Sequence, residues 1–309
     1  MEKIKLLWNI GTNYSATTPF WYTLSLNHKF CHTGHRKELH WLDILESQEF
    51  WATKVKGRPR YYKYFCNRLR GFVKSPLAYL KTDKPSKLQN ARCFTKEEEE
   101  YFFSYPTSIE KYIDYRKRHW NHIKHEYHAL GDFSNSYCLL SEDFMRSIKD
   151  KLLEVFDLKI TVCLRDPVRR IWSHNLCKEN VIFNKSGGID RVSDYGKILR
   201  SYYNVWGKDN VLPIIMEEFW DPSKHREQTE RLSNFLNYPI TNIYKNVYWP
   251  ELGSNSPQYE FLRDQWKDEK DIDSETYKRI YSKLEWIYQD CEEHLGYIPT
   301  NWREWFQTG

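Results

Sequence analysis

Two polar side chains follow a short apolar run near the middle of the sequence. Arg165 comes directly after residues 160–164, a run with β-branched residues that is typical of a strand buried on both faces. Asp166 and Pro167 favour a helix start, because Asp can cap a helix and Pro is tolerated at its first position. Ser173 falls about two turns into that helix. Arg165 alone would fit an ordinary βα unit equally well, but an arginine fork, a hydroxyl and helix N–H groups together suit a phosphate.

A second junction of this kind lies near the start of the chain. Residues 3–10 have the pattern of a strand, Gly11 opens a turn, and a helix is expected from Pro19. The loop between them is rich in hydroxyl groups and consists of Thr12, Asn13, Tyr14, Ser15, Ala16, Thr17 and Thr18. Hydroxyls and backbone amides in such a loop can cradle an anion, although the pattern also fits a plain βα turn. It is not a Walker A loop, because no G-K-[ST] is present.

The segment R-D-P-V-x-R-x-x-S-H, residues 165–174, resembles the 3′-phosphate-binding segment of the sulfotransferases that use 3′-phosphoadenosine 5′-phosphosulfate (PAPS). The resemblance implies that Arg165 and Ser173 hold the 3′-phosphate of this co-substrate. It also aligns residues 13–18, N-Y-S-A-T-T, with the family's 5′-phosphosulfate loop, usually written P-K-x-G-T-T. Ala16 stands in place of the glycine, a small change if its φ is negative.

Tyr14 stands where the family's loop carries Lys or Arg, whose charge assists the departure of the sulfuryl group. A phenol can donate a hydrogen bond, but charge-assisted bonds are about twice as strong as neutral ones. Three explanations remain open at this point. A lysine from elsewhere, with Lys37 as a candidate, takes the place; catalysis is weak; or the site only binds nucleotide.

Residues 36–43, R-K-E-L-H-W-L-D, resemble the K-E-x-H-F-F element of the glycan (heparan-type) branch of these enzymes. The resemblance implies that Glu38 is the general base for the acceptor hydroxyl and that His40 orients it or shares its proton. Without the resemblance, Glu38 would be interpreted as a solvated surface acid.

The rest of the chain predicts an α/β fold. Residues 130–137 and 217–222 resemble two further segments of the same family, and residues 211–216 have the pattern of a buried strand. Helices are expected at residues 144–156, 192–206 and 274–295, with Trp302 and Trp305 packed against the last. Another helix is expected after residues 217–222 and ends at residues 235–236. Alternating strands and helices favour a central parallel sheet flanked by helices, as in sulfotransferases and P-loop NTPases.

We expect one domain over residues 1–309 with an insertion at about residues 50–127. The insertion interleaves cations with aromatic rings and is expected to form a helical subdomain or a lid over the acceptor site. A solvated face over a small helical subdomain fits the same composition. A histidine recurs every three residues in it and just beyond it, at His119, His122, His125 and His128. A mixed polar face explains this spacing better than a metal site does, since no carboxylate partners are evident.

Composition excludes some classes of protein. Lys and Arg number 47 against 42 Asp and Glu, and a net charge of +5 does not by itself demand nucleic acid. No apolar run is long enough to span a membrane, and the first residues lack the apolar stretch of a secretion signal. The seven cysteines are scattered and form no C-x-x-C pair, which favours reduced thiols. These features lead us to expect a cytoplasmic protein.

The sequence therefore predicts a sulfotransferase that moves a sulfuryl group from PAPS to a hydroxyl or amine acceptor. The expected product is 3′-phosphoadenosine 5′-phosphate (PAP), a glycan is the favoured acceptor, and no metal is expected. One alternative is a relative that binds PAP or PAPS without efficient transfer. The other is a nucleic-acid-binding protein that uses the aromatic and basic insertion, a less favoured interpretation.

Overall fold

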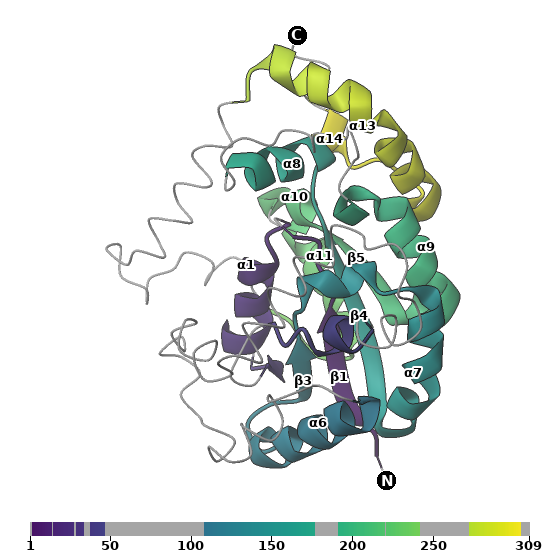
Figure 1. Cartoon of the computed structure of the whole chain (residues 1–309). Coiled ribbons are helices and arrows are strands. Elements are labelled where there is room, and N and C mark those ends of the chain that lie inside the picture. Colours follow the sequence, from purple (N-terminus) through teal and green to yellow (C-terminus); the bar gives the residue numbers. More distant parts are fainter. Residues whose placement is uncertain are drawn as a thin grey trace, which may run out of the picture. The chain divides into compact units, whose positions relative to one another are not determined.

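The chain forms two compact units. Figure 1 shows the helices and strands of the chain, coloured along the sequence. The computed structural model describes residues 2–13, 15–27, 29–33, 38–46, 108–176, 191–219, 221–241 and 272–303. Unit 1 comprises residues 1–9 and 29–159, and unit 2 comprises residues 10–28 and 160–309. The single domain expected over residues 1–309 stays a prediction. Among the described residues, no helix combines the length and the apolar character needed to cross a membrane.

The described strands form a five-stranded sheet in the order β2-β3-β1-β4-β5. In unit 1, β3 (Ala129–Asp132) pairs in parallel with both β1 (Ile4–Asn9) and β2 (Cys31–His32). In unit 2, β5 (Val211–Ile215) pairs in parallel with the later residues of β4 (Phe156–Leu164). The α/β fold with a central parallel sheet, expected from the sequence, is confirmed.

Strand β4 is longer than the apolar run that marks it in the sequence. It begins at Phe156 rather than at Ile160. The sequence pattern misses its first residues because they alternate between buried and more exposed positions and so lack a continuous apolar run. From Ile160 onward every residue is buried, as expected for a strand inside a parallel sheet. Pro213 of β5 lies opposite Val162. Proline donates no ladder hydrogen bond, which suits β5 as the last strand in the described order.

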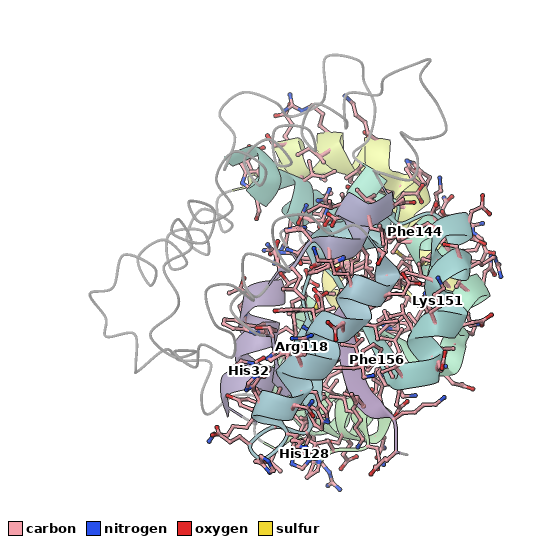
Figure 2. The ribbon with its side chains drawn as sticks, turned by 60° about the horizontal axis from the view of Figure 1, so that its bottom comes forward. His32, Arg118, His128, Phe144, Lys151 and Phe156 are labelled. Carbon is pink, nitrogen blue, oxygen red and sulfur yellow. The ribbon has the colours of Figure 1, made fainter. Side chains whose placement is uncertain are left out.

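The long helices of unit 1 begin at serine caps. The Ser108 hydroxyl accepts a hydrogen bond from the backbone of α6 (Ile109–Ile123), and the Ser141 hydroxyl does the same for α7 (Glu142–Val155), both at 3.2 Å. Each cap satisfies an N–H that has no partner within the helix, a contribution of about 1 kcal/mol. Shorter helical segments span residues 41–46 and Asn135–Leu139. Arg118 of α6 and Lys151 of α7, which are labelled in Figure 2, are both exposed.

Unit 2 holds the helices that follow the other strands. Their bounds are α1 (Thr17–Tyr22) with a π-helical turn (Thr23–Asn27), α8 (Pro167–Leu176), a 3-10 turn (Arg191–Ser193), α9 (Tyr195–Trp206), a 3-10 turn (Lys208–Asn210), α10 (Met216–Phe219), a 3-10 turn (Pro222–Lys224), α11 (His225–Leu236), α13 (Ser274–Leu295) and α14 (Thr300–Arg303). The helix expected from residue 192 is α9, which begins later because Asp194 caps it and the preceding residues form a 3-10 turn.

The long helix α13 agrees with its prediction at both ends. Asp273 caps it, and Gly296, with φ at +82°, ends it in the left-handed conformation that glycine adopts without strain. It packs closely against α9, since a Cβ on Gly196 would come within 2.6 Å of Asp290. The Trp302 side chain is fully buried in unit 2 and its Nε1 donates to Glu217 at 2.9 Å. Trp305 lies outside the described residues.

Candidate functional site

Arg165 and Ser173 are brought together in unit 2, where β4 ends and α8 begins. The Arg165 Nη1 donates to the Ser173 hydroxyl at 3.2 Å. The turn that aligns them is fixed by Asp166, whose side chain accepts from the backbone N–H of Arg169 at 2.9 Å and so caps α8. Arg165 is partly exposed and Ser173 is buried. An arginine fork and a serine hydroxyl that converge at a helix start can bind a phosphate group.

The carboxylate of Asp166 also ties this junction to the end of the chain. It accepts hydrogen bonds from the hydroxyls of Tyr277 at 2.8 Å and Tyr288 at 3.1 Å, both on α13. The backbone N–H of Asp166 donates to Glu217 at 2.9 Å. Complete burial and the nearby Glu217 charge raise the pKa of Asp166 to about 6. The turn that carries Arg165 is therefore held from several sides.

The loop after β1 lies beside this junction. The backbone N–H of Thr12 donates to the carbonyl of Cys163 at 2.7 Å, and the Cys163 N–H donates to the carbonyl of Gly11 at 2.6 Å. Within the loop, the hydroxyls of Thr12 and Ser15 hydrogen-bond to each other at 2.6 Å. The two phosphate-binding segments expected from the sequence, residues 12–18 and 165–173, are thus neighbours in unit 2.

The backbone at Ala16 differs from the expectation. Its φ is +50° and its ψ is +32°, the left-handed conformation, so the condition under which alanine replaces glycine at little cost is not met. An L-residue other than glycine pays about 1–2 kcal/mol there. Ala16 is the N-cap of α1, and its carbonyl accepts the first hydrogen bond of that helix, from the N–H of Phe20 at 3.3 Å. Tyr14 and Lys37 lie outside the described residues, as does most of the insertion, residues 51–107.

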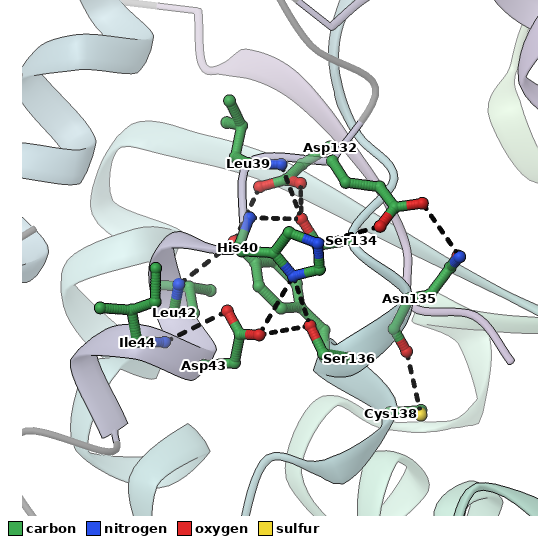
Figure 3. Close-up of polar contacts among 12 residues, drawn as sticks. Leu39, His40, Leu42, Asp43, Ile44, Asp132, Ser134, Asn135, Ser136 and Cys138 are labelled. Atoms are coloured by element: carbon green, nitrogen blue, oxygen red, sulfur yellow. Dashed lines mark hydrogen bonds and ion pairs between the residues drawn. The ribbon is translucent and has the colours of Figure 1, made fainter. Parts of the chain in front are cut away.

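In unit 1, Glu38 and His40 contact each other directly. Figure 3 shows His40 with Asp43, Asn135 and Ser136 around it. The His40 Nε2 lies 2.9 Å from one carboxylate oxygen of Glu38, and the Asn135 side chain donates to the other at 3.1 Å. On its other side, the His40 Nδ1 lies 3.1 Å from Asp43 and 2.7 Å from the Ser136 hydroxyl. The result is a relay from Asp43 through the imidazole to Glu38, whose side chain is 27% exposed.

The electrostatics of this relay favour a charged imidazole. Burial by itself lowers the pKa of His40, but the charges and hydrogen bonds of Asp43 and Glu38 outweigh it and raise the pKa to about 9. At neutral pH both ring nitrogens of His40 then carry protons, one directed to Asp43 and Ser136 and the other to Glu38. An ionised Glu38 held by two donors is oriented to accept a proton at its exposed side.

A buried network holds this segment in place. The Ser134 hydroxyl accepts from the backbone N–H groups of Leu39 at 3.0 Å and His40 at 2.9 Å, and donates to Asp132 at 2.6 Å (Figure 3). Asp132 is completely buried at the end of β3, and burial raises its pKa. Its second oxygen accepts from the Tyr137 hydroxyl at 2.9 Å. The end of β3 thus fixes the backbone that carries Glu38 and His40.

Sequence reasoning missed four members of this site. Asp43, Ser134, Asn135 and Ser136 were not singled out as functional. Asp43 could have been found, because a carboxylate three residues after a histidine at a helix start faces the same side. The other three come from the segment after β3, and only the pairing of distant strands brings them to Glu38.

The histidines of α6 and the residues after it lie in different surroundings. His119 is buried and its Nε2 lies 2.7 Å from the Nδ1 of His32 on β2, whereas His122, His125 and His128 are exposed. In the part of the chain that the structure describes, no group of three His, Cys, Asp or Glu side chains suits a metal ion. His119 therefore belongs to the core between β2 and α6.

Comparison with known proteins identifies the fold. No protein-family model matches the sequence, and no curated protein does. Among solved structures, a sulfotransferase from Alicyclobacillus acidocaldarius aligns with a TM-score of 0.54 at 14% identity, over 96% of this chain and 98% of that one. The chain has a sulfotransferase fold.

Two sulfotransferase domains also align with the chain. One is from the olefin synthase of Synechococcus PCC 7002, with a TM-score of 0.49 at 16% identity over 92% of this chain and 96% of that one. The other is from the curacin biosynthetic pathway, with a TM-score of 0.44 at 16% identity over 92% of this chain and 98% of that one. Function has to be argued from the residues, because one fold can carry many activities.

Proposed function

We propose that the protein is a sulfotransferase that moves a sulfuryl group from PAPS to a hydroxyl or amine. The observation that carries the proposal is the contact between Arg165 and Ser173 in a sulfotransferase fold, with residues 12–18 hydrogen-bonded beside it. Arg165 and Ser173 bind the 3′-phosphate. Asn13, Tyr14, Ser15, Ala16, Thr17 and Thr18 form the loop that receives the 5′-phosphosulfate.

The chemistry needs positioning and charge neutralisation, by analogy with phosphoryl transfer. The acceptor oxygen or nitrogen forms a bond to sulfur while the bond from sulfur to the 5′-phosphate oxygen breaks. PAP leaves with that electron pair, and the acceptor proton passes to Glu38. His40 holds the Glu38 carboxylate in place with its Nε2–H, and Asp43 holds His40. The resemblance of this segment to the glycan branch favours a sugar hydroxyl as acceptor.

A transfer assay with sulfur-labelled PAPS and a panel of sugar, phenol and amine acceptors tests the proposal. We expect label to move to at least one sugar. Glu38→Gln should abolish transfer and leave PAP binding intact, because the amide accepts no proton but keeps the shape of the carboxylate. Unchanged turnover in Glu38→Gln would remove Glu38 from the mechanism. PAP binding without transfer to any acceptor would instead indicate a protein that only binds nucleotide.

Arg165→Ala tests the assignment of the 3′-phosphate. Removing one partner of a close ion pair costs about 2–4 kcal/mol of binding free energy, so PAP affinity should fall by at least tenfold in calorimetry. Arg200→Ala is the matched control, since Arg200 is half-exposed on α9 and should leave affinity unchanged. Equal affinities in the wild type and Arg165→Ala would show that the phosphate binds elsewhere.

A further inference from the structure

Arg170 is a charged side chain that the proposed mechanism leaves without a role. It lies on α8 and is completely buried in unit 2. Its Nη1 donates to the backbone carbonyl of Asn13 at 3.3 Å, and its Nη2 donates to the hydroxyl of Ser193. One guanidinium thus joins α8, the loop of residues 12–18 and the 3-10 turn before α9.

The phenol of Tyr195 extends this cluster to the other phosphate-binding junction. Its hydroxyl donates to the backbone carbonyl of Arg165 at 3.0 Å, and it also interacts with the Thr12 side chain. Burial raises the pKa of Tyr195, and the positive charge of Arg170 opposes that rise, as expected for close neighbours. Arg170 and Tyr195 therefore connect both segments that would hold the nucleotide.

The position of this charge matters because the loop supplies none of its own. Residues 12–18 contain no lysine or arginine, although a phosphosulfate carries negative charge. Burying a guanidinium costs several kcal/mol before its hydrogen bonds compensate, and an apolar side chain of similar size often stabilises a fold as well. A buried charge also acts through a low dielectric, where its attraction for a nearby anion is stronger than in water.

We propose that Arg170 is a positioning residue for the 5′-phosphosulfate, which it serves by holding the loop at Asn13 and by placing positive charge behind it. The inference rests on the proposed function, because it assumes that this loop receives the 5′ end of the nucleotide. Arg170 acts through the loop and is not expected to touch the transferred group.

Three ligands separate this role from a general effect on folding. PAP carries both phosphates, adenosine 5′-phosphate carries only the 5′ group, and adenosine 3′-phosphate carries only the 3′ group. In Arg170→Gln we expect calorimetry to show that the affinities for PAP and for adenosine 5′-phosphate fall by about tenfold or more relative to the wild type. Adenosine 3′-phosphate should bind within about twofold of the wild type. Arg170→Lys, which keeps the charge but not the fork, should fall between.

Controls make each outcome decisive. Arg200→Gln removes the same charge from an exposed site and should change none of the affinities. Ser193→Ala removes one hydrogen-bond partner of Arg170 by a small truncation. If Arg170→Gln does not fold, Ser193→Ala and Arg170→Lys are measured in its place. We expect Ser193→Ala to weaken adenosine 5′-phosphate by a few-fold and spare adenosine 3′-phosphate.

Two results would overturn the inference: folded variants that bind adenosine 5′-phosphate as the wild type does, or variants that lose both monophosphates equally. A wild type that binds none of the three ligands would instead refute the proposed function itself.

Discussion

The charged state of His40 can be tested by its effect on stability. The pKa of His40 is raised from 6.5 to about 9, although burial alone would lower it, because Asp43 and Glu38 favour the protonated ring. A group with a raised pKa in the folded state contributes stability that is complete below its unfolded pKa. That contribution is lost as pH rises through the folded value. The window for His40 therefore runs from about 6.5 to about 9.

The size of the effect follows from the same two values. Each unit of difference between folded and unfolded pKa corresponds to about 1.4 kcal/mol, so the rise from 6.5 to about 9 gives about 3 kcal/mol in total. The His40 side chain is only 11% exposed, so solvent screens little of it. In His40→Gln this contribution is absent at every pH.

Urea unfolding of the wild type and His40→Gln at about pH 6 and about pH 10 measures the difference. The free-energy gap between the two proteins should shrink by about 3 kcal/mol across that range. His122→Gln changes an exposed imidazole of the same unit and should leave the pH dependence as in the wild type. A gap that is constant with pH, or one that widens, would refute the imidazolium and with it the relay from Asp43 to Glu38.

Other substitutions address unit 2. Ala16→Gly should raise the free energy of unfolding by about 1 kcal/mol, because φ at this residue is +50°; a loss of stability in urea unfolding would contradict that conformation. Asp166 has a pKa raised to about 6 from 3.8, so wild-type stability should fall as pH rises through this window. Asp166→Asn should remove that fall, and a variant whose stability depends on pH as that of the wild type does would contradict the raised pKa of Asp166. Tyr14→Lys should preserve or raise the transfer rate, whereas a collapse would point to a dedicated role for the phenol.

The parts of the fold that the sequence predicted are those with local causes. An apolar run followed by Asp166 and Pro167 specifies a strand end and a helix start through contacts only a few residues apart. Helix α13 was predictable because Asp273 caps it, Gly296 ends it and its apolar residues recur with helical spacing. Strand β4 was predicted too short, since its first residues alternate in burial and carry a weaker signal.

The candidate site was predictable only in part, because several of its contacts join residues that are distant in the sequence. Asn135 contacts Glu38 across 97 positions of the chain and Ser136 contacts His40 across 96, and no local pattern encodes that pairing. Residues 169 and 170 are both arginines, yet only Arg170 is fully buried. The Arg170 guanidinium contacts the Asn13 carbonyl and the Ser193 hydroxyl, and both come from segments distant in the sequence that no local pattern relates to α8.

A crystal structure of the protein with PAP tests the central claim most directly. The account predicts that the 3′-phosphate lies within hydrogen-bond distance of the Arg165 guanidinium and the Ser173 hydroxyl, with the 5′-phosphate against residues 12–18. A nucleotide bound anywhere else, or an Arg165 side chain turned away from the phosphate, would contradict it.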